Sequence, residues 1–382
     1  MNKIVIASDS FKGCLSSIEV ADAAEAGIRM VFPDCTVVKV AAADGGEGTA
    51  EVIGKSIGAE RTEVHVSDPL GRPISSFYYH KDGLAVIESA AACGLTLLSA
   101  DERNPLLTST RGLGEIILKA YENGCRKFII GLGGSATNDG GSGMLEALGA
   151  RFTGRDGQMI EGLCGEKISL VASIDVSGIP QELSGSEFII ACDVDAPLTG
   201  MNGATKVFAP QKGADPQMVQ VLEDGMTSYS DVLSRETGRD IPSVPGAGAA
   251  GGLGAAFLSF FNARLEKGRD IILDIIGFDS LISDADLIIT GEGKVDHQTG
   301  QGKLISGVIE RARTRQTPVL VIAGTVEEGH DLTRTGEKFP TVLSIGKRPE
   351  SKSDLEHAMR PEVASYAIEN TVSKALVSLF PF

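Results

Sequence analysis

A segment dense in glycine and short polar residues stands in the first half of the chain. The residues from Gly131 to Gly143, GLGGSATNDGGSG, include six glycines, and they lie between an apolar strand-like run and a helical run. Glycine lets backbone N–H groups approach a ligand, and the start of a helix attracts negative charge. The segment therefore predicts a cradle for a nucleotide or substrate phosphate, with a plain strand-to-helix turn as the alternative.

Three further polar clusters follow strand-like runs. They are Asp9–Lys12 (DSFK), Asp44–Thr49 (DGGEGT) and Gly291–Lys303 (GEGKVDHQTGQGK). Because ligands of a doubly wound sheet gather at the carboxyl ends of its strands, we expect the three clusters to converge. Their lysines would supply the positive charge that a phosphate or carboxylate needs, and these are Lys12, Lys294 and Lys303. Taken singly, an aspartate at such a position is equally typical of a helix cap.

Two carboxylates follow the strand-like run that ends at Cys192. Asp193 and Asp195 share one side of an extended segment, because alternate residues of a strand point the same way. The Mg²⁺ of phosphoryl transfer is usually held by one or two carboxylates together with substrate oxygens. The pair predicts a metal site, with two solvated aspartates at a strand end as the alternative. Among the histidines, His297 lies inside a polar cluster and is a candidate substrate contact.

Familiar nucleotide-binding signatures fit poorly. Gly54-Lys55-Ser56 has Thr49 at the first Walker position and lies in a helix-like segment, so it does not predict a P-loop. The run from Gly131 to Ala136 fits the G-x-G-x-x-A dinucleotide variant, which keeps an NAD(P)-dependent dehydrogenase open. A non-catalytic sensor of small acids is a second alternative. The HRD and DFG motifs of protein kinases, the HExxH motif of zinc proteases and the GxSxG nucleophile elbow are absent from the sequence.

Composition narrows the classes of partner. The net charge is −16, and the 47 glycines among 382 residues exceed the usual level of about 7 per cent. The acidic balance argues against nucleic acid and anionic membrane surfaces. The six cysteines form no CxxC pair, and no apolar run reaches the roughly 18 residues of a membrane helix. Asp9 interrupts the N-terminal apolar run where a signal peptide would continue. We expect a cytoplasmic protein, either a monomer or a homodimer.

The order of predicted elements indicates an α/β fold. Strands at 3–8 and 36–41 alternate with helices, which is typical of a parallel sheet. After residue 60 the pattern indicates antiparallel strands, with a hairpin turn at Lys81-Asp82-Gly83. From residue 285 the alternation of strands and helices returns. The simplest architecture that accounts for this order is a Rossmann-like, doubly wound parallel-sheet domain formed by residues 1–70 plus 285–382. Residues 71–284 would form an inserted mixed α/β domain, with the active site in the cleft between the two.

These blocks together resemble the bacterial glycerate kinase family. IASDSFKGCLS looks like its opening motif, and six further blocks follow in the family's order: ADGGEGT, GLGGSATNDGGSG, ACDVDAPLTGMNGA, VFAPQKGA, GAGAAGGLGAA and ITGEGKVDHQTGQGK. The resemblance spans nearly the whole chain. It implies an ATP- and Mg²⁺-dependent kinase that phosphorylates a hydroxyl of D-glycerate, with 2-phosphoglycerate favoured over 3-phosphoglycerate as the product.

The resemblance also implies roles for particular residues. Those expected to bind the nucleotide or its phosphates are Gly133, Gly134, Ser135, Asn138, Asp9, Ser10, Asp44, Gly45, Gly46 and Glu47. The expected catalytic residues are Asp193, Lys12, Asp296 and Lys303, and the expected metal ligands are Asp193 and Asp195. In this scheme lysine and glycine-rich backbone neutralise the two anionic substrates while a carboxylate accepts the hydroxyl proton.

Overall fold

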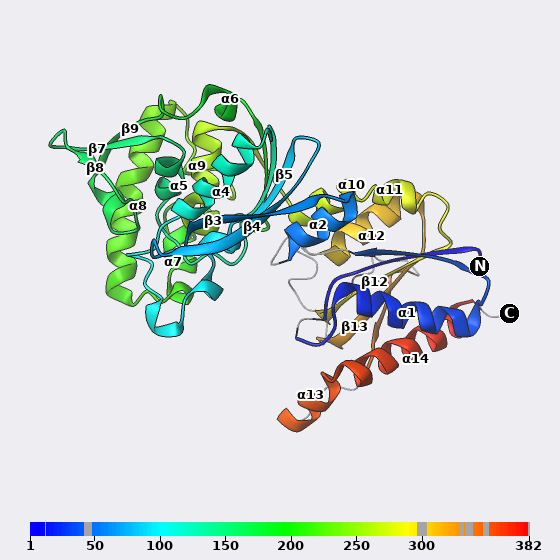
Figure 1. Ribbon diagram of the computed structural model, residues 1–382. Helices are drawn as coiled ribbons and strands as arrows, with labels where there is room; N and C mark the ends of the chain where they lie inside the picture. Colours follow the sequence, from blue (N-terminus) through cyan, green and yellow to red (C-terminus); the bar gives the residue numbers. More distant parts are fainter. Residues whose placement is uncertain are drawn as a thin grey trace. The chain divides into compact units, whose positions relative to one another are not determined.

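The computed structural model describes residues 1–11, 13–41, 48–295, 304–327, 332, 339–346 and 351–380. It has an α/β fold and divides into two compact units (Figure 1). Unit 1 consists of Met1–Asp44 together with Arg269–Phe382, and unit 2 of Gly45–Gly268. The predicted fold class, a doubly wound parallel-sheet domain with a second, inserted mixed α/β domain, is confirmed.

Unit 1 contains a five-stranded parallel sheet in the order β14-β13-β12-β1-β2. The strands are β1 (Lys3–Ser8), β2 (Thr36–Ala41), β12 (Leu287–Val295), β13 (Val319–Val326) and β14 (Thr341–Ser344). Valine, isoleucine and leucine dominate the three central strands because both faces of the sheet are buried. The carboxyl ends of β1 and β12 are neighbours, since the Asp9 N–H donates to the Gly291 carbonyl at 3.0 Å.

Helices cover both faces of this sheet. One face packs against α1 (Ser17–Val31) and α14 (Pro361–Leu379), which lie side by side in Figure 1. The other face packs against α10 (Gly268–Ile275), α11 (Phe278–Leu281) and α12 (Leu304–Arg315). Alternate residues of β1 enter the two cores, Ile4 and Ile6 on one side and Val5 on the other, as the period of two requires. The short helix α13 (Lys352–Ala358) precedes α14.

Unit 2 contains a mixed six-stranded sheet in the order β11-β10-β6-β5-β4-β3. The strands are β3 (Glu60–Ser67), β4 (Pro73–Lys81), β5 (Leu84–Glu88), β6 (Lys127–Gly131), β10 (Glu187–Ala191) and β11 (Asn262–Glu266). From β5 to β11 the pairs are parallel, whereas β3, β4 and β5 are antiparallel. Asp82 and Gly83 both have positive φ, at 48° and 81°, which a two-residue hairpin turn requires.

The remaining elements of unit 2 surround this sheet. Its helices are α2 (Thr49–Ile57), α3 (Ala90–Cys93), α4 (Arg111–Glu122), α5 (Ser142–Ala147), α6 (Gln181–Ser184), α7 (Ala204–Phe208), α8 (Pro216–Thr237) and α9 (Ala249–Phe260). A three-stranded sheet has the order β8 (Met159–Ile160), β7 (Arg151–Gly154), β9 (Val171–Asp175). The core centres on stacked rings of Phe128 and Phe188, whose centroids are 4.6 Å apart.

The division between the units differs from the boundaries that the sequence predicted near residues 70 and 285. It falls at 44/45 and 268/269. At the first boundary, β3 pairs with β4 along its whole length, which assigns residues 60–67 to unit 2. At the second, α10 and α11 pack their apolar residues against the sheet of unit 1. Gly54-Lys55-Ser56 lies inside α2, so it is no P-loop, as predicted. In the described part of the chain, no helix is long and apolar enough to cross a membrane.

Candidate functional site

The glycine-rich segment after β6 has two distinct halves. In the first half, Gly133 and Gly134 form an exposed turn, and Gly134 has φ +70°. Among the described residues, the N–H groups of these two glycines have no hydrogen-bond acceptor. The next helix, α5, begins only at Ser142. The G-x-G-x-x-A pattern is therefore not followed at once by a helix, as a dinucleotide-binding turn would be.

The second half of the segment is filled by a carboxylate of the protein itself. Asp139 is fully buried and accepts hydrogen bonds from the N–H and hydroxyl of Thr110, both at 2.8 Å, and from the N–H groups of Gly141 and Gly143 at 3.1 and 3.2 Å. The Gly140 N–H donates to the Gly251 carbonyl. Burial raises the pKa of Asp139, and these donors oppose the rise. The later glycines thus bind an internal anion, and only the first half can meet a ligand.

A cavity of about 230 Å³ lies beside that first half. It is lined by Gly133, Gly134, Ser135, Asp193 and Lys212, with further residues from the end of β10, the 3₁₀ turn Pro210–Lys212 and α9. Three of the predicted nucleotide-binding residues and one predicted catalytic residue therefore come together here. Asn138 does not line the cavity, because it is fully buried and its Nδ2 donates to Thr205 Oγ1 at 3.1 Å.

Lys212 is the cation of this cavity. Its side chain is 3% exposed, and its Nζ donates to Ser135 Oγ at 3.0 Å and to the Thr137 carbonyl at 2.7 Å. Burial lowers the pKa of Lys212 to about 7, although the nearby Asp139 carboxylate raises it. Sequence reasoning missed this residue, because a lone lysine is usually a solvated surface group. Its place in the VFAPQKGA block is the signal that could have identified it.

Asp193 lies two residues after the end of β10, where the sequence predicted a catalytic carboxylate. Its side chain is exposed at the cavity, and its Oδ1 accepts a hydrogen bond from the Gly268 N–H at 3.0 Å. Asp195 is exposed as well but does not line the cavity. Cys192 lines the same cavity, and burial raises its pKa to about 11. Among the described residues, no group of three or more possible metal ligands occurs.

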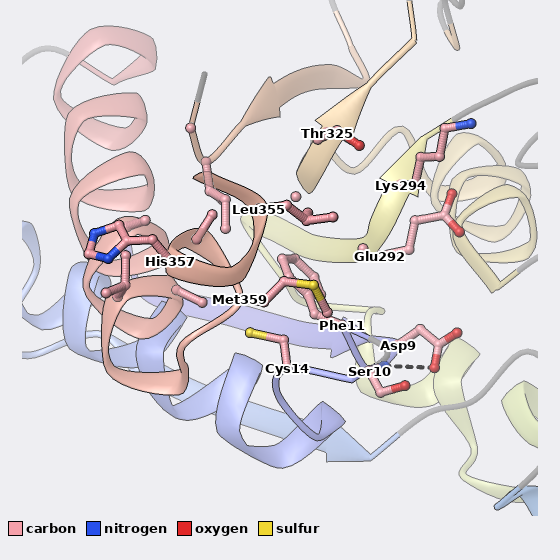
Figure 2. Close-up of a pocket in the computed structure, with 18 residues that line it drawn as sticks. Asp9, Ser10, Phe11, Cys14, Glu292, Lys294, Thr325, Leu355, His357 and Met359 are labelled. Carbon is pink, nitrogen blue, oxygen red and sulfur yellow. Dashed lines mark hydrogen bonds between the residues drawn. The ribbon is translucent and has the colours of Figure 1, made fainter. Parts of the chain in front are cut away.

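A second cavity, of about 490 Å³, lies in unit 1 at the carboxyl ends of the parallel strands (Figure 2). Asp9 and Ser10 line it, and the Ser10 N–H donates to Asp9 Oδ1 at 2.7 Å. Glu292 and Lys294 of β12 also line it. The first and third polar clusters therefore converge, as predicted, in the part of each that the structure describes.

Several predicted site residues lie outside the described residues. They are Lys12, Asp44, Gly45, Gly46, Glu47, Asp296, His297 and Lys303. Their roles stay predictions.

Comparison with known proteins identifies the chain's relatives. The model of the glycerate kinase family matches residues 4–377. The chain belongs to the glycerate kinase family. It is therefore a kinase.

Individual relatives agree with this assignment. The chain is 47% identical to glycerate kinase of Bacillus subtilis (strain 168) over 326 residues, which cover 85% of each chain. It is 46% identical to glycerate 2-kinase of Escherichia coli (strain K12), over 85% of this chain and 86% of that protein. A crystal structure assigned to glycerate kinase 2 of Salmonella typhimurium LT2 matches with a TM-score of 0.86 at 41% identity, covering 99% of this chain and 98% of the other.

Proposed function

We propose that this protein transfers the γ-phosphoryl group of ATP to a hydroxyl of D-glycerate, with ADP and phosphoglycerate as products. Membership of the glycerate kinase family supports glycerate as the acceptor. The similarity to a protein named glycerate 2-kinase favours 2-phosphoglycerate over 3-phosphoglycerate. Mg²⁺ and a nucleotide donor are the usual requirements of phosphoryl transfer.

The observation that carries the proposal is the chemistry of the unit 2 cavity. A buried ammonium, that of Lys212, two N–H groups from Gly133 and Gly134, and one carboxylate, that of Asp193, surround about 230 Å³. This volume is below the roughly 300–1,000 Å³ of cavities for larger ligands, and it suits a three-carbon acid. Glycerate brings one negative carboxylate and two hydroxyls. The cavity offers cationic and N–H donors for the carboxylate and a proton acceptor for a hydroxyl.

In this scheme side chains and backbone groups of the protein bind the substrates and accept the hydroxyl proton. Lys212 and the glycine N–H groups hold the glycerate carboxylate or the transferring phosphoryl group, and they are pre-oriented by Ser135 and the turn. Asp193 accepts the proton of the attacking hydroxyl or binds Mg²⁺. Its exposed carboxylate can take either role, because aspartate is ionised at neutral pH. Further charged groups are proposed to take part in the reaction, namely Lys12, Asp44, Asp296 and Lys303.

The residues present also fit a Mg²⁺ ion. Asp193 and Asp195 are exposed oxygen donors two residues apart, and Mg²⁺ in kinases commonly takes one or two carboxylates and keeps water and phosphate oxygens as its other ligands. When bound, the ion would neutralise charge on the phosphate oxygens of the donor.

A coupled assay of ADP release tests the proposal. With D-glycerate, ATP and Mg²⁺ we expect turnover that stops when EDTA removes the metal, and ³¹P NMR of the product would identify the phosphorylated hydroxyl. L-Glycerate and lactate serve as controls for acceptor identity. No ADP release with D-glycerate under any metal condition would refute the proposal, and a 3-phosphoglycerate signal would overturn the preferred regiochemistry alone.

A further inference from the structure

The unit 1 cavity has no role in the acceptor site described above. It is about twice the volume of the unit 2 cavity, at about 490 Å³ against 230 Å³. A cavity of this size falls in the range that encloses a drug-sized organic molecule. It also stands at the carboxyl ends of β1, β12, β13 and β14, where ligands of doubly wound sheets bind.

One wall of the cavity is apolar. Phe11 and Cys14 come from the loop after β1, and the Phe11 N–H donates to the Leu15 carbonyl at 2.8 Å, which fixes that loop. Leu355 and Met359 come from α13 and the residue after it, and α14 completes the wall with Val363, Ala364 and Ala367. Figure 2 shows Phe11, Leu355 and Met359 gathered in the middle of the view. A flat heterocycle fits such a surface, since thioether sulfur and aromatic rings both contact ring systems favourably.

The opposite wall is polar and charged. Asp9, Glu292 and Lys294 lie together on the other side of the view in Figure 2. Asp9 and Glu292 are 8% and 6% exposed, so their carboxylates are largely enclosed by protein. Acidic side chains at the ends of parallel strands are the groups that bind ribose hydroxyls in other nucleotide sites. The cavity thus combines an apolar region for a base with acceptors for a sugar.

We propose that this cavity binds the adenosine part of the phosphoryl donor. The base lies against Phe11, Leu355 and Met359, and the ribose lies toward Asp9 and Glu292. The inference rests on the proposed function, because a kinase needs a donor site and the unit 2 cavity is too small to hold both substrates. It assigns the wall formed by α13 and α14 to the recognition of nucleoside.

Two cysteines make the proposal measurable without any assay of activity. Cys14 lines the unit 1 cavity and Cys192 the unit 2 cavity, and among the cysteines these two are partly exposed while the other four are buried. Modification by N-ethylmaleimide, followed by peptide mass spectrometry, therefore reports on each cavity separately. All samples are labelled at one fixed pH, so that a change in rate reports on access to each thiol.

We expect saturating ADP or adenosine to slow the modification of Cys14 at least ~10-fold while the rate at Cys192 changes less than twofold. D-Glycerate should protect Cys192 and leave Cys14 unchanged. Adenosine is the decisive probe because it carries no phosphate, so it tests the base and sugar positions alone. Protection of Cys192 by adenosine would overturn the proposal, and so would an unchanged rate at Cys14 with both ADP and adenosine.

A filled-cavity variant gives a second, independent measurement. Ala367→Phe places a ring in the cavity from α14, and we expect it to raise the KM for ATP at least ~10-fold with little change in the KM for glycerate. Val377→Phe adds a similar ring on an exposed part of the same helix and is the matched control. If the wild-type enzyme releases ADP yet Ala367→Phe has a normal KM for ATP and Cys14 is not protected, the nucleoside site is wrong while the function stands. Failure of ADP release in the wild type refutes the function itself, whatever the labelling shows.

Discussion

At the scale of single residues, burial distinguishes one lysine from its neighbours. Lys206 and Lys212 are six positions apart in the same region of unit 2. Lys206 is partly exposed and its Nζ lies 3.6 Å from the Met201 sulfur, whereas Lys212 is buried against Ser135 and the Thr137 carbonyl. A buried ammonium is costly unless the site uses its charge. The position of Lys212 therefore fits the anionic ligand proposed for this cavity.

Replacing Lys212 with methionine tests that role. Met keeps most of the side-chain volume and removes the charge, so we expect kcat/KM for glycerate to fall at least ~100-fold, or about 3 kcal/mol of transition-state stabilisation. The melting temperature should change little, because removal of a desolvated charge offsets the loss of the hydrogen bonds to Ser135 Oγ and the Thr137 carbonyl. Lys206→Met is the matched control. Normal kinetics in Lys212→Met would remove this residue from the site.

The lowered pKa of Lys212 also predicts a pH dependence of stability. The folded protein has a pKa of about 7 at this group, against an ordinary value of 10.5. Between these values the unfolded chain binds more protons, so the free energy of unfolding rises with pH, by at most about 1.4 kcal/mol per pH unit from this group. Relative to Lys212→Met, the wild type should gain stability from pH 7 to pH 9.5 in urea titrations. A difference that does not vary with pH would contradict the low pKa.

Asp193→Asn separates two roles of one carboxylate. The amide keeps an oxygen that can accept the Gly268 N–H, so the fold should persist. We expect kcat to fall ~10²-fold or more if Asp193 accepts the hydroxyl proton. If excess Mg²⁺ restores the rate, the residue is instead a metal ligand. Asp175→Asn, at an exposed residue of β9, is the control. A near-normal kcat of Asp193→Asn at ordinary Mg²⁺ would exclude both roles.

At the scale of elements, the glycine-rich segment shows what local sequence can and cannot predict. Its strand, its loop and the helix after it follow from the sequence, and so does its capacity to bind an anion. The sequence does not reveal that the anion in its second half is Asp139, because the position of that carboxylate depends on Thr110, which is distant in the chain. Only the fold brings the two together.

Asp139→Ala should therefore act on stability more than on chemistry. It leaves the buried N–H groups of Thr110, Gly141 and Gly143 without their acceptor, and each such loss costs about 1–3 kcal/mol. We expect the free energy of unfolding to fall by about 3 kcal/mol or more in urea titrations. Asp240→Ala, at an exposed position, should change it by less than about 0.5 kcal/mol. A loss that small in Asp139→Ala would show that the loop does not depend on this carboxylate.

Elements with strong local signals were predicted well. Local signals of this kind also mark helix ends in the structure, where Ser16 and Glu19 form a capping box at the start of α1 and Pro216 and Gly238 bound α8. The strands at 3–8 and 36–41 have the expected limits. The sequence did not predict β11, because NARLE is polar and half-exposed and pairs only as an edge strand of the sheet. The small sheet of β7, β8 and β9 was missed for another reason, because its strands are only 4, 2 and 5 residues long.

At the scale of the whole molecule, each unit has its own sheet and core. The inserted arrangement could be predicted because parallel strand patterns occur at both ends of the chain and antiparallel ones between them. The boundaries could not be placed, because β3 has the alternation of an ordinary strand and nothing local says which sheet it joins. The unit 2 cavity was predicted in part, through Gly133, Gly134, Ser135 and Asp193, and Lys212 appeared only with the structure.

Unit 2 should fold as an isolated fragment. Residues 45–268 contain all six strands of the mixed sheet and its complete aromatic core. We expect a purified fragment of these residues to show a cooperative thermal transition and the far-UV circular dichroism of an α/β protein. A fragment of residues 71–284, which lacks β3, should be less stable, since it loses one edge of the sheet. Equal stability of the two would contradict the boundary at 44/45.

The pairing of β1 between β2 and β12 has a consequence for how the protein is made. The ribosome completes β1 and β2 first, yet β12 emerges only after the whole of unit 2, a delay on the order of tens of seconds at ordinary rates of translation. Throughout that time one edge of a strand whose central residues, Ile4 to Ala7, are apolar has no native partner. The nascent amino-terminal segment is therefore the part of this chain most exposed to aggregation, and slow translation between the two halves of unit 1 should lower the yield of folded enzyme.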